Sequence, residues 1–349
     1  MVLPRHLALL IVLLATSGCF TTRYLAQAAG GQYELVHRAR SLRSVIADEQ
    51  TDPRVRALLA KVPAIKRFGQ GHGLTPTANY RDYVDLHRSA AVYVVQGCAP
   101  LEFKPRRWSF PIVGSVPYLG FFDEAAARAY ASQLERDEAL DVTVRTAAAY
   151  STLGWFHDAV LSTMIPTGPE AFAELANVIL HESVHATVYV ADQSALDESL
   201  ASYVADELTW ELVVGRSGLQ SPEAKAWIAG EARGQRFLAE LRRAHDELDA
   251  LYRSALPDDE KRARKDARLT LLQQTLGLRR RYNNADLAGV RTYDSGHEAF
   301  ARLHRACGSW SKMLGAIGTL APTDFAGPQQ AHFDDVIDAL AARACVAGR

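Results

Sequence analysis

The sequence predicts a predominantly helical α+β fold, in which a small β-sheet backs two successive helices and a helical hairpin follows toward the C-terminus. Three observations lead to this expectation. Strand-like segments alternate with one helical segment between residues 91 and 145, helical patterns fill the chain from residue 169 onward, and residues 181–185 read His-Glu-Ser-Val-His on the first of those helices. A few strands followed by a run of helices are typical of an α+β fold.

The composition is that of an ordinary globular protein. The 349 residues are 48% hydrophobic and 23% charged, and 39 basic residues nearly balance 40 acidic ones, for a net charge of −1. These values exclude extended disorder and collagen-like repeats. The length suits one large domain or two modest ones. Because no net positive field would attract a polyanion, we expect no nucleic-acid partner.

Residues 1–18 have the pattern of a secretory signal, with a polar start, an apolar run from Leu7 to Ala15 and small residues before Cys19. The run is too short for a membrane-spanning helix, which needs about 20 residues. The small residues resemble a bacterial lipobox, although Thr16 stands where Leu is usual, so we expect lipid on Cys19. An ordinary cleaved signal is the alternative. Phe20 is not the aspartate that signals inner-membrane retention. We therefore expect an envelope lipoprotein that faces the periplasm, in the outer membrane rather than the inner.

The chain after the signal segment is expected to have three parts. Residues 19–90 form an N-terminal helical segment, residues 91–217 a core with the sheet and the His-Glu-Ser-Val-His helix, and residues 218–349 a C-terminal helical region packed on the core. In the first part we expect a helix from Tyr24 to about Ala60, interrupted near residue 53, and a short helical stretch around Tyr80 to Ala90.

The core begins with the expected sheet. Ala91–Val95 has the composition of a strand, and Trp108–Phe122 reads as an extended strand or hairpin whose prolines favour an edge position. Asp123 can cap a helix that runs to about Arg136, and Asp141–Arg145 looks like the next strand.

Helices make up the rest of the chain. Pro169 to about Ala191 has apolar residues at helical spacing, and Ser194-Ala195-Leu196-Asp197 has the capping-box form that starts a second helix to about Val214. Further helices are expected from Ser221, from Asp259 to Leu278 as the return arm of a hairpin, near His297–Ile317 and near Phe333–Ala344. The three remaining cysteines form no disulfide framework, and the sequence leaves open a single bridge between Cys307 and Cys345.

The sharpest signal for chemistry is His181-Glu182-Ser183-Val184-His185. Residues four apart lie on one face of a helix, with Cβ atoms about 6 Å apart, so both imidazoles can reach one ion. Glu182 borders the same space without having to bind. This arrangement suits Zn²⁺, with Glu182 as general base toward a zinc-bound water.

A catalytic zinc needs a third protein ligand. Glu198 follows His185 by 13 residues, in the first turn of the next helix, and a reversing turn would bring it back toward the histidines. Asp192 and Asp197 are alternatives, but Asp192 falls in the turn and Asp197 is better used by the capping box. Glu198 as a solvated helix-terminal acid is the structural alternative.

The chain resembles the bacterial family of putative aminopeptidases, which are zinc lipoproteins of gluzincin type. Six stretches carry the resemblance, in order, over most of the mature chain: Trp108–Gly114, Tyr118–Asp123, Ala149–Phe156, His181–His185, Glu198–Ala201 and Asn283–Leu287. The resemblance implies that His181, His185 and Glu198 bind zinc. It also implies that Glu182 is catalytic and that the protein is anchored to a membrane. The family usually has Asn where this chain has Asp197.

These expectations together describe a zinc peptidase, an aminopeptidase by the resemblance, that hydrolyses peptides. An additional donor must then stabilise the oxyanion. The candidates lie in motif-like segments away from the plain helices: Tyr118, Tyr150, Asn283, Asn284, Tyr293 and His297. An edge strand within residues 112–122 could hold the substrate by strand addition. Two alternatives remain open: a non-catalytic envelope lipoprotein whose zinc stabilises a binding or scaffold surface, and a zinc hydrolase of another amide.

Overall fold

The computed structural model describes residues 19–110, 114–149, 157–290, 296–327, 329–330 and 332–345. The expected signal segment therefore lies outside the described residues. The predicted fold class is confirmed, because long helices dominate the described chain and its strands form small sheets of two or three members. Among the described residues, no helix is both long and apolar enough to span a membrane.

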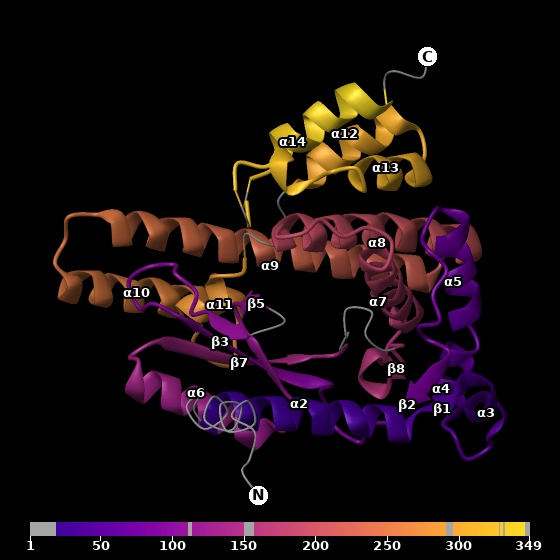
Figure 1. Ribbon diagram of the computed structural model, residues 1–349, viewed down its shortest axis with the longest axis horizontal. Coiled ribbons are helices and arrows are strands. Elements are labelled where there is room, and N and C mark those ends of the chain that lie inside the picture. Colours follow the sequence, from indigo (N-terminus) through magenta and orange to yellow (C-terminus); the bar gives the residue numbers. More distant parts are fainter. Residues whose placement is uncertain are drawn as a thin grey trace, which may run out of the picture.

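The first helix, α2 (Cys19–Arg38), runs along one edge of the molecule and begins at the residue expected to carry lipid (Figure 1). It is followed by β1 (Arg40–Ser41), α3 (Leu42–Ala47), α4 (Pro53–Leu59) and α5 (Val62–Gly71). The expected interruption near residue 53 is present, but the helix expected from Tyr24 to about Ala60 is also broken after Arg38, where β1 pairs with a distant strand. Asp52 caps α4 there by accepting hydrogen bonds from two backbone N–H groups, and proline at the first helical position needs no such partner.

The prediction of a short helix around Tyr80 to Ala90 is wrong. This segment contains β2 (Asp82–Val84), which pairs antiparallel with β1 and parallel with β8 (Val160–Leu161). The pairing partners lie far away in the sequence, so local propensity could not reveal them. Tertiary pairing overrides a weak helical pattern in such short segments.

The larger sheet has β3 (Val92–Cys98) at its centre, between β6 (Leu119–Phe121) and β7 (Asp141–Ala147), with all pairs antiparallel. A separate hairpin joins β4 (Trp108–Phe110) to β5 (Gly114–Val116). The helix α6 (Glu124–Asp137) begins at the cap predicted for Asp123 and packs on this sheet. The predicted strands and the edge position are thus confirmed.

The edge of β6 is not free for another chain. The side chain of Gln27 on α2 donates to the carbonyl of Gly120 at 3.0 Å and accepts from the N–H of Phe122 at 3.1 Å. The Tyr24 hydroxyl accepts from the N–H of Gly120 at 3.3 Å. Because these side chains occupy the hydrogen-bonding groups of the strand, the suggested strand addition at this edge is wrong.

Two consecutive helices follow β8 and the short 3₁₀ turn η1 (Ser162–Met164): α7 (Ala171–His185) and α8 (Ser194–Ser217). The prediction of a capping box at the start of α8 is wrong. Gln193 is the N-cap and Ser194 is already helical, while the Asp197 carboxylate accepts from the backbone N–H of Val190 at 3.0 Å. Asp197 therefore closes the loop between the two helices instead of capping the second.

The C-terminal region has the predicted hairpin of α9 (Pro222–Arg253) and α10 (Asp258–Leu276), and then the short α11 (Asn284–Leu287). The expected helix near 297–317 is split into α12 (His297–Cys307) and α13 (Trp310–Ile317), because Gly308 takes a left-handed φ of 72°. The 3₁₀ turn η2 (Pro322–Asp324), α14 (Asp334–Leu340) and the π-helical turn η3 (Ala341–Cys345) complete the described chain. A disulfide joins Cys307 to Cys345.

The main hydrophobic core runs through all three parts of the chain. Buried side chains from α3, α5, β2, α7, α8 and α12–α14 belong to one cluster. Figure 1 shows α12, α13 and α14 as a layer stacked over α8 and the adjoining end of α9. The division at residues 90 and 217 stays a prediction. The shared core fixes α7 and α8 from several sides.

Candidate metal centre

Helices α7 and α8 face each other along a polar stripe. The Asn177 side chain on α7 donates to the Asp206 carboxylate on α8 at 2.8 Å, and eight residues onward on α7, His185 lies against Glu198, eight residues earlier on α8. Residues at intervals of four share one face of a helix. The two helices therefore run in opposite directions, and the stripe places His181 and His185 opposite Glu198.

Three side chains with ligand-type atoms meet at this interface. The Nε2 atoms of His181 and His185 are 3.2 Å apart. Glu198 brings one carboxylate oxygen to 3.5 Å from Nε2 of His181 and the other to 3.8 Å from Nε2 of His185. Within the part of the chain that the structure describes, this is the one group of three His, Cys, Asp or Glu residues whose ligand atoms lie within 4.8 Å of one another.

The spacing fits a tetrahedral zinc ion. With bonds of about 2.0–2.2 Å from the metal to nitrogen or oxygen, tetrahedral geometry separates the ligand atoms by about 3.4 Å. The two imidazole nitrogens are 3.2 Å apart, and each lies 3.5 or 3.8 Å from a different oxygen of the Glu198 carboxylate, so the observed separations lie around that value. The side chains keep 21%, 21% and 32% exposure, so the group is open to solvent on one side. Two histidines and one carboxylate form a donor set suited to a catalytic zinc.

The electrostatics favour the metal-binding forms of Glu198 and His185, and the protonated form of His181. Burial would raise the pKa of Glu198, but the hydrogen bond with His181 and the charges of both histidines lower it below its usual value. Burial and the charge of His181 lower the pKa of His185, which favours the neutral imidazole. Burial would also lower the pKa of His181, but the carboxylates of Glu198 and Glu182 outweigh it and raise that pKa. A metal competes with the proton held there.

Glu182 lies beside the histidines in a different environment. Burial raises the pKa of its carboxyl group to about 7; the positive charge of His181 opposes the rise, and the carboxylates of Glu198 and Asp158 add to it. Its side chain has no hydrogen-bond partner among the described residues. A carboxylate with a pKa near the working pH can both take and return a proton.

Two further carboxylates near this group were missed by the sequence reasoning. Asp206 faces His181 across the interface, and Asp158 lies within electrostatic reach of Glu182. Asp206 had a readable signal, because it follows Glu198 at twice the four-residue spacing, on the same face of α8. Asp158 had none, since it reaches Glu182 from a loop that is distant in the sequence.

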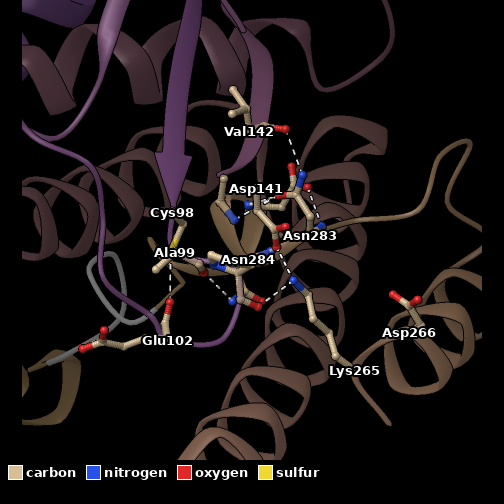
Figure 2. Close-up of polar contacts among 12 residues, drawn as sticks. Cys98, Ala99, Glu102, Asp141, Val142, Lys265, Asp266, Asn283 and Asn284 are labelled. Atoms are coloured by element: carbon tan, nitrogen blue, oxygen red, sulfur yellow. Dashed lines mark hydrogen bonds and ion pairs between the residues drawn. The ribbon is translucent and has the colours of Figure 1, made fainter. Parts of the chain in front are cut away.

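The other predicted donors are not brought to the histidines. Figure 2 shows Asn283 and Asn284 at the end of the larger sheet, where Asn283 donates to the carbonyl of Val142 and Asn284 donates to that of Ala99. Asn284 is fully buried, and its side-chain oxygen accepts from the Tyr252 hydroxyl. These amides join the α9–α10 hairpin to β3 and β7, and Figure 1 places α11 well apart from α7.

The remaining candidates fall into two groups. Tyr150 and Tyr293 lie outside the described residues. Tyr118 is 46% exposed between β5 and β6, and the His297 ring packs edge-to-face against Tyr203. The geometry thus gathers His181, Glu182, His185 and Glu198 at one place, and the described donors on the candidate list at others.

Comparison with known proteins gives one match. The family model described as "Putative aminopeptidase" matches residues 23–330, which is most of the chain. No curated protein and no solved structure matches the chain.

Proposed function

Because this chain belongs to the family of putative aminopeptidases, we propose that it is a zinc-dependent peptidase of gluzincin type that trims peptides from the amino end. One observation carries the proposal. Two imidazole nitrogens and a carboxylate oxygen converge within 4.8 Å of one another, with a partly buried glutamate beside them. A site that only stabilised the fold would not need that glutamate.

His181, His185 and Glu198 would hold the ion. Bound zinc would supply Lewis-acid polarisation of the peptide carbonyl and make a water more acidic. The remaining chemistry belongs to the protein. A neutral His185 and an ionised Glu198 are ready to bind, and the Asp206 carboxylate lies within electrostatic reach of His181.

Glu182 would move the proton. As the water oxygen forms its bond to the carbonyl carbon, the Glu182 carboxylate takes one proton from that water. When the carbon–nitrogen bond of the resulting tetrahedral adduct breaks, Glu182 returns the proton to the leaving amine, so the products are an acid and an amine. Its pKa near 7 suits both transfers, because a group poised at the working pH neither holds nor loses the proton too strongly.

Membrane attachment would come from the first residue of α2. Lipid on Cys19 would place the anchor at the start of a helix whose side chains hold β6, so the attachment would be close to the folded body. The protein would then act on periplasmic peptides from the surface of the outer membrane. Labelling with a radioactive fatty acid, compared between the natural chain and Cys19→Ala, tests this part separately.

The decisive variant for the chemistry is Glu182→Gln, which keeps the side chain's size and removes its base. Purified protein is incubated with a mixed peptide library, products are identified by mass spectrometry, and zinc is measured in the same sample. We expect turnover to fall by about 10²–10⁴-fold while zinc stays near one ion per chain. Glu174→Gln, an exposed glutamate on the same helix, is the matched control and should leave both unchanged.

Two results would contradict the proposal. One is a Glu182→Gln protein that cleaves as fast as the natural chain. The other is a natural chain with full zinc content that cleaves no peptide at any pH between 5 and 9, which would favour the non-catalytic scaffold. The ends of the cleaved peptides also distinguish trimming from internal cleavage.

A further inference from the structure

A loop before β2 runs along the helix that carries the histidines. The N–H of Thr75 donates to the Thr187 hydroxyl, just past the end of α7, at 2.8 Å. Gly69, at the end of α5, approaches so closely that an added Cβ would lie 3.0 Å from the Leu180 side chain. The segment from residue 69 to residue 75 is therefore packed against the C-terminal end of α7, between Leu180 and Thr187.

Tyr80 follows this segment and is held from a second direction. Its N–H donates to the carbonyl of Asp158 at 2.6 Å, and the N–H of Asp158 donates to the Asn79 side chain at 3.2 Å. Asp158 is also one of the carboxylates that act on Glu182. Tyr80 thus lies where the loop, the Asp158 segment and α7 meet.

The backbone of Tyr80 is strained. Its φ is +60°, a left-handed conformation that bulky side chains rarely adopt. Such a conformation costs on the order of 1–3 kcal/mol, and it persists only where the surrounding contacts impose it, which is common at active sites. The contacts of Asn79 and Tyr80 with Asp158 are what impose it here.

Among the described residues, none is a hydrogen-bond partner of the Tyr80 hydroxyl. The residue itself is 4% exposed. Burial, with the negative charges of Glu182 and Asp158, raises the pKa of Tyr80 well above its usual value, so the group remains a donor at every working pH. A hydroxyl that donates to no described residue is available to an incoming acceptor.

We propose that the Tyr80 hydroxyl donates a hydrogen bond to the carbonyl oxygen of the substrate as that oxygen becomes negative. The inference rests on the proposed function and adds an oxyanion donor, which none of the described candidates supplies at the histidines. Glu182 would take a proton from the water and return it to the leaving amine, while Tyr80 would donate a hydrogen bond to the carbonyl oxygen. Tyr80 is then a catalytic residue, and its backbone strain is the cost of placing the ring beside Glu182.

Tyr80→Phe removes the hydroxyl and keeps the ring. Loss of one oxyanion donor lowers kcat by about 10²–10³-fold, and we expect KM to change little. The second readout is binding. The Kd of a phosphinic peptide, whose tetrahedral phosphorus mimics the adduct, should weaken by a similar factor in calorimetry, while zinc content stays the same. Tyr83→Phe is the matched control, because Tyr83 is also buried and its hydroxyl already bonds to Ser162.

Several results would overturn the proposal. Tyr80→Phe could bind the phosphinic peptide as tightly as the natural chain. Tyr118→Phe could instead show the loss, which would assign the donor to that exposed tyrosine. Tyr80→Phe could lose zinc or melt at a lower temperature, which would make the hydroxyl structural. None of these results touches the role of Glu182, so the failure of this inference and the failure of the proposed function are distinguishable.

Discussion

Asp197 accepts a hydrogen bond from the backbone N–H of Val190 at 3.0 Å, and this contact closes the loop that returns α8 to α7. The other oxygen of the same carboxyl group is buried and has no hydrogen-bond partner among the described residues. Burial raises the pKa of Asp197 to about 7; the bond from Val190 opposes the rise and the charge of Glu198 adds to it. The residue beside Glu198 therefore aligns the site and destabilises the fold when it is ionised.

Asp197→Asn should keep the accepting oxygen and remove that charge. Since the pKa in the folded protein lies above the unfolded value of about 3.9, the contribution of Asp197 is fully present below about pH 4 and is lost as the pH rises through 7. We expect the metal-free variant to be more stable than the natural chain by on the order of 1–3 kcal/mol at pH 8, and the difference to narrow at pH 4. Urea unfolding at both pH values measures it.

The control is Asp192→Asn, an exposed aspartate in the same loop with a left-handed φ of 61°, which asparagine tolerates equally well. It should show no such pH dependence. An Asp197→Asn protein that is less stable than the natural chain at pH 8 would mean that the charge is useful to the fold.

The placement of the two histidines and Glu198 on consecutive helices follows from local signals. A four-residue interval puts His181 and His185 on one face, and apolar residues at helical spacing define α7 itself. The turn before Glu198 is short enough that the next helix must run back along the first. The spacing of the histidines, the apolar pattern of α7 and the short turn each involve residues close together in the chain, so they can be recognised from one sequence.

The errors come from contacts between distant segments. The strand β2 forms because β8 pairs with it from 76 or more residues away. Asp197 is a local exception, because it binds the N–H of Val190, seven residues earlier, instead of capping its own helix. Asn283 and Asn284 look like site residues because polar side chains stand together there, but their partners are backbone carbonyls of β7 and of the residue after β3. Tyr80 gave no sign in the sequence, because its importance lies in a backbone angle and in its contact with the distant Asp158.

Glu198→Ala tests the third ligand. Zinc added to the metal-stripped natural chain should raise its stability by about 2.7 kcal/mol when the free ion is at 100 times its Kd. Loss of a residue that hydrogen-bonds to a metal ligand lowers metal affinity by roughly 10–100-fold. Because Glu198 would itself be a ligand, we expect its loss to lower the affinity for zinc by more than that. Thermal melting at graded zinc concentrations measures both. Glu211→Ala on the same helix, where the glutamate contacts His72, should behave as the natural chain does, and equal affinities in all three proteins would exclude Glu198 as a ligand.

The junction between the α9–α10 hairpin and the sheet depends on one buried ion pair. Lys265 is 7% exposed and binds the Asp141 carboxylate and the carbonyl of Pro100 at the end of the sheet, as Figure 2 shows for the first of these. Lys265→Met removes the cation and leaves a mostly buried carboxylate uncompensated. Breaking such a pair from one side costs about 3–5 kcal/mol, so we expect a loss of that size in urea unfolding.

Zinc content should be unchanged in Lys265→Met, because the pair lies against β7 and α11 and not against the histidines. Lys261→Met, one turn earlier on α10, removes a hydrogen bond to the carbonyl of Tyr252. It should lower the free energy of unfolding by less than Lys265→Met does. In the double variant Lys265→Met/Asp141→Leu no charge is left unpaired, so part of the stability should return. If the double variant is as unstable as Lys265→Met alone, the loss comes from packing of the lysine stem and not from the charge left on Asp141.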